Sequence, residues 1–175
     1  MIELSNEVKI TDPCYSNDTC CSYKLDNVKS GQYNTRVEYY NEFYGVRVAE
    51  LIAIHEDYDI DSEDVNWEVV KDADIGVDSG QCGIFDANYY KQQKEQDEIL
   101  EKQNKGEPFY NKCCNCTDEE AKYSEIDNKG VVSCTGFGDG SYNLYTIKIN
   151  NEIVAIKVVF INTNREEDYE EDYEG

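Results

Sequence analysis

The sequence predicts an α+β protein that is mainly β, in which antiparallel sheets form a sandwich or a partly open barrel and one surface helix spans residues 87–104. Three observations lead to this prediction. Runs rich in β-branched and aromatic residues alternate with turn signals. The 175 residues suffice for one ordinary domain with a substantial core. Aromatic residues make up 12% of the chain, which is too many for a disordered polyanion.

The strongest strand signal lies near the C-terminus of the chain. Residues 142–149 (YNLYTIKI) and 152–161 (EIVAIKVVFI) are rich in β-branched and aromatic residues, and Asn150 and Asn151 separate them. Asparagine tolerates the positive φ of a tight primed turn, so the pattern predicts a β-hairpin. The second strand is apolar on both faces except at Lys157, which predicts a central strand covered on each side. We expect one face to hold Val154, Ile156, Val158 and Phe160, and the other Ile153, Ala155, Val159 and Ile161.

Two further strands and one helix are predicted upstream. Residues 33–40 and 46–54 are strand candidates, with a turn at 41–45 between them. Asp86 is a suitable N-cap, since its carboxylate can accept from backbone N–H groups two or three residues on. The polar run 87–104 then predicts a helix that ends near Gly106. Because its apolar residues are sparse, we expect this helix to lie on the surface.

Negative charge is concentrated in two segments of the chain. The formal net charge is −22 at pH 7. Residues 56–78 hold ten acidic residues and one lysine, and residues 165–175 hold seven acidic residues and one arginine. We predict a single mainly-β domain over residues 1–162 and an acidic, disordered tail at 163–175. A polyanion repels nucleic acid and anionic membranes, so direct binding to either is disfavoured and a basic protein surface is the expected partner.

The chain shows no targeting signal. Its first ten residues, MIELSNEVKI, carry two glutamates and no apolar run, unlike a secretory signal peptide. No uncharged apolar stretch approaches the roughly 20 residues that span a bilayer. We therefore expect a cytoplasmic protein without a membrane partner, and the pattern indicates no particular oligomeric state.

The eight cysteines are interpreted as free, reduced thiols that behave as small hydrophobic residues. A long chain without an export signal is a poor candidate for a disulfide framework. The alternative is a zinc site in which Cys20, Cys21, Cys113 and Cys116 supply four thiolates. Its spacing is unusual, because neighbouring cysteines here are adjacent or separated by one residue, whereas paired zinc ligands are normally separated by two.

A second metal hypothesis rests on alternating acidic residues. Oxygen ligands at alternate positions can surround a calcium ion, and a final glutamate can close the cage. The sixth place of this register is Ser62, where a calcium loop needs glycine, and no flanking helix pair is evident. Chance acidity is therefore the preferred interpretation, and we expect no cofactor. The residues in this register are Asp57, Asp59, Asp61, Glu63 and Glu68.

Two glycine-rich passages, at residues 75–86 and 136–142, contain residues that could form a catalytic or ligand-binding site. Ser79 as a nucleophile would need a base, and the only histidine is His55. A dyad of Cys82 and His55 is conceivable from composition alone. Asp-Ser-Gly is also a favourable turn sequence, so we expect structural turns and no enzyme. If the turns converge, Asp12, Asp78 and Asp139 would form a small carboxylate site.

The order of these motifs resembles the bacterial and phage family called domain of unknown function 4241. The resemblance extends over residues 10–161 and combines a Val-Asp-Ser-Gly motif with a later Gly-Asp-Gly-Ser-Tyr motif. It implies a shared fold and assigns no activity, while the cysteine-rich stretches and the acidic tail depart from the family pattern. The matching residues are Asp12–Pro13, Gly31, Tyr33, Trp67–Glu68, Val77–Gly80, Phe85–Asp86 and Gly138–Tyr142.

Two classes of function remain open at this point. The first is a non-enzymatic acidic binding protein, an inhibitor or charge mimic that engages a basic protein in phage–host or toxin–immunity conflict. The alternative is a metal- or small-ligand-binding module, or an enzyme, centred on the two glycine-rich turns. The tail interleaves tyrosine with acid, as a contact segment would. Candidate binding residues are Asp12, Asp78, Ser79, Asp139, Tyr142, Glu166, Tyr169 and Tyr173.

Overall fold

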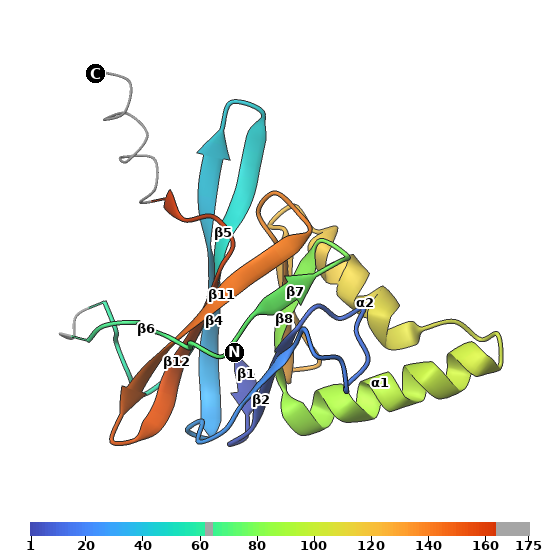
Figure 1. The fold of residues 1–175 in the computed structure, drawn as a ribbon, viewed down its shortest axis with the longest axis horizontal. Helices are drawn as coiled ribbons and strands as arrows, with labels where there is room; N and C mark the ends of the chain where they lie inside the picture. Colours follow the sequence, from blue (N-terminus) through green and yellow to red (C-terminus); the bar gives the residue numbers. More distant parts are fainter. Residues whose placement is uncertain (62–64, 164–175) are drawn as a thin grey trace.

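A computed structural model describes residues 1–61 and 65–163, and it places two antiparallel sheets and two helices in layers (Figure 1). The predicted α+β, mainly-β class is confirmed. The two sheets face each other as a sandwich, and within the described ranges they do not close into a barrel. No helix in these ranges is both long and apolar enough to cross a membrane.

The larger sheet has seven strands, and all of its ladders are antiparallel. The short β7 (Ile75–Val77) pairs with the start of β11 and lies off the main path of the sheet. The long hairpin of β4 and β5 extends well beyond the rest of the molecule (Figure 1). In spatial order the main path is β1 (Ile2–Leu4), β4 (Gly31–Glu42), β5 (Gly45–His55), β12 (Glu152–Val159), β11 (Gly140–Ile149) and β6 (Glu68–Val69).

The smaller sheet has five antiparallel strands. Its centre is β8 (Gln81–Asp86), which follows β7 along the chain after one tight turn. The chain therefore passes from one sheet to the other at residues 78–80. In spatial order the five strands are β3 (Tyr23–Leu25), β2 (Val8–Thr11), β8, β10 (Gly130–Cys134) and β9 (Tyr123–Ile126).

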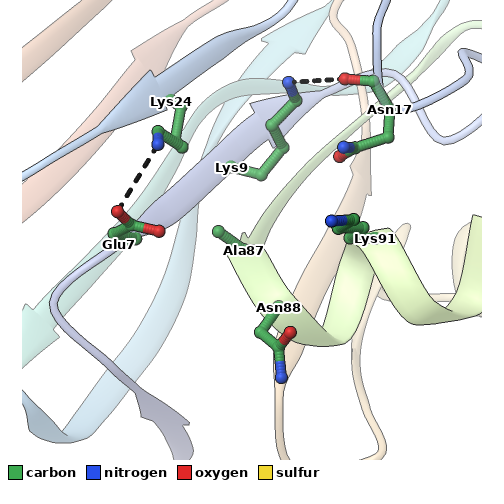
Figure 2. Close-up of a pocket in the computed structure, with 7 residues that line it drawn as sticks. All are labelled: Glu7, Lys9, Asn17, Lys24, Ala87, Asn88 and Lys91. Carbon is green, nitrogen blue, oxygen red and sulfur yellow. Dashed lines mark hydrogen bonds and ion pairs between the residues drawn. The ribbon is translucent and has the colours of Figure 1, made fainter.

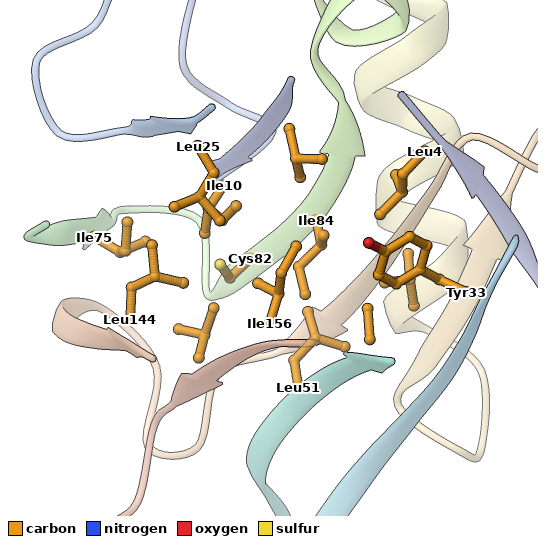
Figure 3. Packing of buried hydrophobic residues seen from close by; sticks show 14 of the residues in the cluster. Leu4, Ile10, Leu25, Tyr33, Leu51, Ile75, Cys82, Ile84, Leu144 and Ile156 are labelled. Carbon is orange, nitrogen blue, oxygen red and sulfur yellow. The ribbon is translucent and has the colours of Figure 1, made fainter. Parts of the chain in front are cut away.

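The main hydrophobic core lies between the two sheets (Figure 3). Alternate residues of each strand point inward, as strand geometry requires. Tyr33 is among the largest fully buried side chains, and its hydroxyl donates to the carbonyl of Lys29 at 2.7 Å. The polar tip of this ring is thus satisfied inside the core. Other members of this cluster include Ile10, Leu51, Cys82, Ile84, Leu144 and Ile156.

A second apolar cluster covers the outer face of the seven-stranded sheet. Tyr58, Ile60, Val65 and Trp67 pack on the side chains that β5, β11 and β12 present there. Lys157, the charged exception in β12, places its Nζ 4.5 Å from the centre of the Trp67 ring, a cation–π contact. The prediction that residues 152–161 form a central strand covered on both sides is therefore confirmed, with β12 lying between β5 and β11.

The predicted division of β12 into two faces is wrong at its start. Ile147 pairs with Ala155 but Lys148 pairs with Ile153, so Val154 is an extra residue, a β-bulge. A bulge reverses the side on which the residues before it point. As a result Ile153 joins the core between the sheets, while Val154 joins the outer cluster.

Helix α1 (Ala87–Lys102) confirms the predicted surface helix, and Asp86 caps it by accepting the N–H of Tyr89 at 3.2 Å. The expectation of a single helix is wrong, because α2 (Pro108–Thr117) follows. Asp97 of α1 is buried and accepts the N–H groups of Phe109 and Tyr110 at 2.9 and 3.0 Å, so one helix caps the other.

The signal for α2 was present in the sequence. Phe109, Cys113 and Cys116 follow at i, i+4 and i+7, which is the spacing of one helical face, and Pro108 is a favoured first residue. These three side chains are buried with Phe85 and Tyr90 in a third cluster, between the helices and the outer face of the smaller sheet.

The hairpin turn at Asn150 and Asn151 has the predicted conformation. Their φ angles are 54° and 67°, and the flanking pair Ile149–Glu152 closes a two-residue loop. A β-branched residue is strained at such a φ.

We therefore expect Asn151→Val to lower the free energy of unfolding by about 1–2 kcal/mol, the cost of a left-handed residue with a Cβ branch. Asn151→Gly should leave it unchanged or raise it slightly. Urea unfolding followed by circular dichroism measures both values. Equal stability of the two variants would contradict the turn assignment.

Candidate functional site

The carboxylate of Asp12 joins the Asp-Pro turn to the Val-Asp-Ser-Gly turn. Asp12 follows β2 and is fully buried. Its Oδ2 accepts the N–H groups of Asp78 and Ser79 at 2.9 and 2.7 Å. Its Oδ1 accepts the Ser79 hydroxyl at 2.6 Å and the N–H of Cys14 at 2.8 Å. A carboxylate offers about four lone-pair positions, so these bonds use its capacity within the fold.

Tyr15 and helix α1 hold the same region from two sides. The Tyr15 hydroxyl donates to Asp78 Oδ2 at 2.6 Å, and burial together with this carboxylate raises the pKa of Tyr15. The phenol therefore stays protonated and keeps donating. On the helix side, the buried Lys94 donates to the carbonyl of Pro13 at 2.7 Å, and Tyr90 donates to the carbonyl of Tyr15.

The Gly-Asp-Gly-Ser-Tyr motif lies beside these turns. The β7–β11 ladder pairs Val77 with Gly140, so residues 78 and 139 follow at the same end of the ladder. Asp139 is exposed and does not join Asp12 in a buried carboxylate cluster. Tyr142 supports its own loop, because its hydroxyl donates to the carbonyl of Gly138 and its ring lies edge-on to Phe160 at 5.1 Å.

Next to the two motifs is a hollow of about 190 Å³. Residues of both glycine-rich passages line it, including Gly80, Gly136 and Gly138, and Arg47 and Lys122 bring positive charge from other elements. Arg47 already donates to the carbonyl of Gly136 at 3.2 Å and contacts Glu42 at 3.4 Å. The glycine-rich loops lack a basic residue of their own, and only the tertiary structure supplies one.

Among the described residues, no hydrogen bond joins His55 to Ser79 or to Cys82. Ser79 donates its hydroxyl to Asp12. His55 lies at the end of β5, where Nδ1 accepts the N–H of Asp57 at 3.2 Å and Nε2 lies 3.2 Å from the carbonyl of Ser30. This arrangement fits a neutral imidazole with the proton on Nε2. Burial raises the pKa of Cys82, so its thiol stays protonated.

The His55 ring has a structural role that explains Gly31, the first residue of the Gly-x-Tyr motif. A Cβ on Gly31 would lie 2.6 Å from His55 Nε2, and the φ of Gly31 is +142°. The ring also stands edge-on to Tyr33 at 5.2 Å and to Tyr58 at 5.8 Å. His55 thereby connects the core of the sandwich to the outer cluster.

The cysteines do not form the predicted alternative zinc site. Across residues 1–61 and 65–163, no three or more His, Cys, Asp or Glu side chains gather as a metal would require. Cys20 and Cys21 lie after β2 with their Sγ atoms 3.8 Å apart, whereas Cys113 and Cys116 are buried beneath α2. Burial raises the pKa of Cys113 and Cys116, and it raises that of Cys14 to about 12.

The calcium register is also not assembled among the residues that the structure describes. Asp61 pairs with Arg36 at 3.2 Å, and Asp57 lies 4.0 Å from Lys29. Glu68 is exposed in β6, and Glu63 lies outside the described residues. The carboxylates point outward instead of toward a common centre.

The described parts of the acidic segment 56–78 bury apolar side chains in two places. Tyr58, Ile60, Val65 and Trp67 pack on the outer face of the seven-stranded sheet, whereas Ala73, Ile75 and Val77 join the core between the sheets. All eight of its acidic residues that the structure describes are exposed. The segment therefore presents a fixed array of carboxylates to solvent. Those eight are Glu56, Asp57, Asp59, Asp61, Glu68, Asp72, Asp74 and Asp78.

The tip of the β4–β5 hairpin carries an aromatic pair that sequence reasoning missed. The side chains of Phe43 and Tyr44 are 96% and 89% exposed, and their rings meet edge-on at 5.3 Å. The sequence did contain an indication of this pair, because Phe43 and Tyr44 fall within the turn predicted at residues 41–45. Side chains in such a turn are not expected to reach the hydrophobic core. Exposed apolar groups of this size are candidates for contact with a partner.

The predicted binding residues of the tail, Glu166, Tyr169 and Tyr173, lie outside the described residues, as does nearly all of the predicted disordered segment. Comparisons of the chain with protein-family profiles, with curated proteins and with solved structures find no match. The resemblance to the domain of unknown function 4241 therefore stays a prediction.

The Asp12 bonds yield a stability test. Asp12→Asn places an NH₂ group against two of the four donors, so we expect the free energy of unfolding to fall by about 3 kcal/mol. Ser79→Ala removes a single charge-assisted bond and should cost about half as much. The exposed Asp139→Asn is the matched control, with an expected change below about 0.5 kcal/mol. Urea unfolding measures all three, and an Asp12→Asn protein as stable as the control would refute the role of Asp12.

Proposed function

We propose that this chain is a non-enzymatic acidic binding protein that engages a basic protein surface. The observation that carries the proposal is the ordered carboxylate array of residues 56–78. Its eight described acidic side chains face solvent, while neighbouring apolar side chains anchor the segment in the outer cluster and in the core between the sheets. An array held in place loses little conformational entropy on binding, unlike charges on a flexible segment.

Charge and shape both support a protein partner. The net charge of −22 attracts a basic surface from a distance and repels other polyanions. The exposed ring pair of Phe43 and Tyr44 offers the apolar contact that charge alone does not supply. The array and the ring pair are connected through the seven-stranded sheet, because Asp61 bonds to Arg36 of β4 and this strand continues to the hairpin tip.

Within this proposal, the biological setting is an inhibitor or charge mimic in phage–host or toxin–immunity conflict. A protein that occupies a nucleic-acid-binding surface needs clustered acid on a stable scaffold, and the carboxylate array fits that need. The resemblance to a bacterial and phage family, which rests on sequence motifs alone, agrees with this setting.

The test is capture of basic proteins from a bacterial lysate on the immobilised chain, followed by titration with the purified captured protein. Raising the salt concentration should weaken the complex, because the contacts are mainly ionic. Neutralising Asp57, Asp59 and Asp61 together to Asn should weaken it about tenfold. The matched control neutralises Glu95, Glu98 and Glu101 on α1 to Gln and should change the affinity less than twofold.

Two results would refute the proposal. One is binding that is insensitive to salt and to the triple Asn variant, even when residues 165–175 are also deleted. The other is an equal loss in the α1 control, which would assign the effect to net charge instead of the array. Phe43→Ala is an independent probe of the apolar contact and should also weaken the complex.

A small-ligand-binding module centred on the Val-Asp-Ser-Gly and Gly-Asp-Gly-Ser-Tyr turns is the second candidate. The observation that favours it is the hollow in which Gly80 and Gly136 meet Arg47. If this hollow binds a small carboxylic acid, its titration should shift the amide resonances of these glycines saturably, and Arg47→Gln should weaken binding about tenfold. Shifts centred elsewhere in a panel of such acids would remove this candidate.

A further inference from the structure

A basic pocket lies on the opposite sheet from the acidic array. It has a volume of about 320 Å³ and lies between the β2–β3 pair and the first turns of α1 (Figure 2). Three of the chain's 16 basic residues line it, against one acidic residue, although the whole chain carries a net charge of −22. The lining residues are Glu7, Lys9, Asn17, Lys24, Ala87, Asn88 and Lys91.

The fold brings these three lysines together against their mutual repulsion. Lys9 and Lys24 are direct register partners in the antiparallel β2–β3 ladder, so their side chains leave the same face of the sheet. Like charges in such a cross-strand pair are destabilising. Lys91 follows Ala87 by four residues, which puts both on the pocket side of α1.

The positive charge in the pocket is compensated only by exposed or half-exposed acidic side chains. Lys9 donates to the carbonyl of Asn17 at 3.0 Å, and the exposed Asp18 is its nearest charged influence of opposite sign. Lys24 contacts Glu7 at 3.4 Å and Asp26 at 3.7 Å, in pairs whose side chains are about half exposed and therefore weak. Lys91 makes no hydrogen bond or ion pair with any residue that the structure describes.

Burial is the main cause that lowers the pKa of Lys9. Asp18 raises this pKa and Lys24 lowers it, and the effect of Asp18 is the larger of the two. A bound anion would favour the charged form of this partly buried lysine further.

The start of α1 borders the pocket, and its first-turn residues Ala87 and Asn88 line the cavity. The N–H groups of this first turn are partly capped, because the carbonyl of Glu7 accepts the N–H of Ala87 and the Asp86 carboxylate accepts that of Tyr89. The negative charge of Asp86 also offsets the partial positive charge of the helix start. The lysine ammonium groups are therefore the groups here that suit a phosphoryl group.

We propose that this pocket binds a small phosphoryl anion, as inorganic phosphate or as a phosphate monoester, with Lys9, Lys24 and Lys91 as its cationic ligands. The cavity volume lies at the lower end of the range for small-molecule sites, which suits a compact ligand. A nucleic acid would extend past the pocket onto a strongly acidic protein and be repelled. Lys24 also lines a neighbouring cavity with Glu68 of the acidic array, but phosphoryl binding does not depend on the binding function proposed above.

The experiment is an amide NMR titration of the full chain at low ionic strength with two probes, inorganic phosphate and glycerol 3-phosphate. Saturable shifts are expected at Lys9, Lys24, Asn88 and Lys91. Lys91→Gln should weaken binding about tenfold, since it removes one charge-assisted contact. This lysine is exposed, so the variant should fold. Lys102→Gln, about 16 Å further along the same helix, is the matched control and should change affinity less than twofold.

Each outcome decides the proposal. Binding of either probe with the expected variant pattern supports it, and the preferred probe identifies whether the source is free phosphate or an ester. No saturable shift with either probe overturns it. Equal weakening by Lys102→Gln also overturns it, because the effect would then reflect net charge alone. A single-stranded oligonucleotide that binds more tightly than both probes and is weakened by Lys91→Gln would overturn the small-ligand assignment.

Discussion

The buried carboxylate of Asp12 is the constraint on which the arrangement of the two sheets depends. β7 belongs to the larger sheet and β8 to the smaller one, so residues 78–80 carry the chain across the sandwich. Asp12, at the end of β2, binds both N–H groups and the hydroxyl of that crossing. Unpaired backbone groups inside a core are costly, and a charged acceptor compensates two of them at once. The turn that looked like a candidate catalytic motif is thereby explained as a junction.

The strong acidity of the chain is compatible with folding because of where the charge lies. In the described parts of residues 56–78 most apolar side chains pack in the outer cluster or in the core, and the carboxylates face water, where solvent and salt screen their repulsion. Where a charge does meet the outer cluster, it is compensated, as Lys157 is by the ring of Trp67 and by Glu50 at 3.7 Å. The carboxylates of this segment thus stay on the surface of a conventional sandwich, and the buried Asp12, Asp86 and Asp97 each accept hydrogen bonds from the backbone.

The two faces of the molecule differ in charge and therefore in the partners they suit. The larger sheet carries the ordered carboxylates and supports the hairpin with Phe43 at its tip. The smaller sheet, with α1 beside it, gathers Lys9, Lys24 and Lys91 around a cavity. The net charge of the chain agrees with the acidic face but gives no indication of the lysine-lined cavity. An acidic protein can hold a basic pocket because water and salt weaken the potential of distant carboxylates. The nearby lysine side chains then determine the local potential in the pocket.

Local patterns in the chain were enough to predict the mainly-β class, the hairpin at Asn150 and Asn151, the central position of β12 and the Asp86 cap of α1. Each of these depends on neighbours within a few residues, through strand alternation, turn conformation or capping. The β12 bulge, the bonds of Asp12 to residues 78 and 79, and the meeting of Lys9 with Lys91 required the tertiary structure. These features join residues far apart in the chain, and no local preference encodes which distant groups the packing of two sheets will bring within bonding distance.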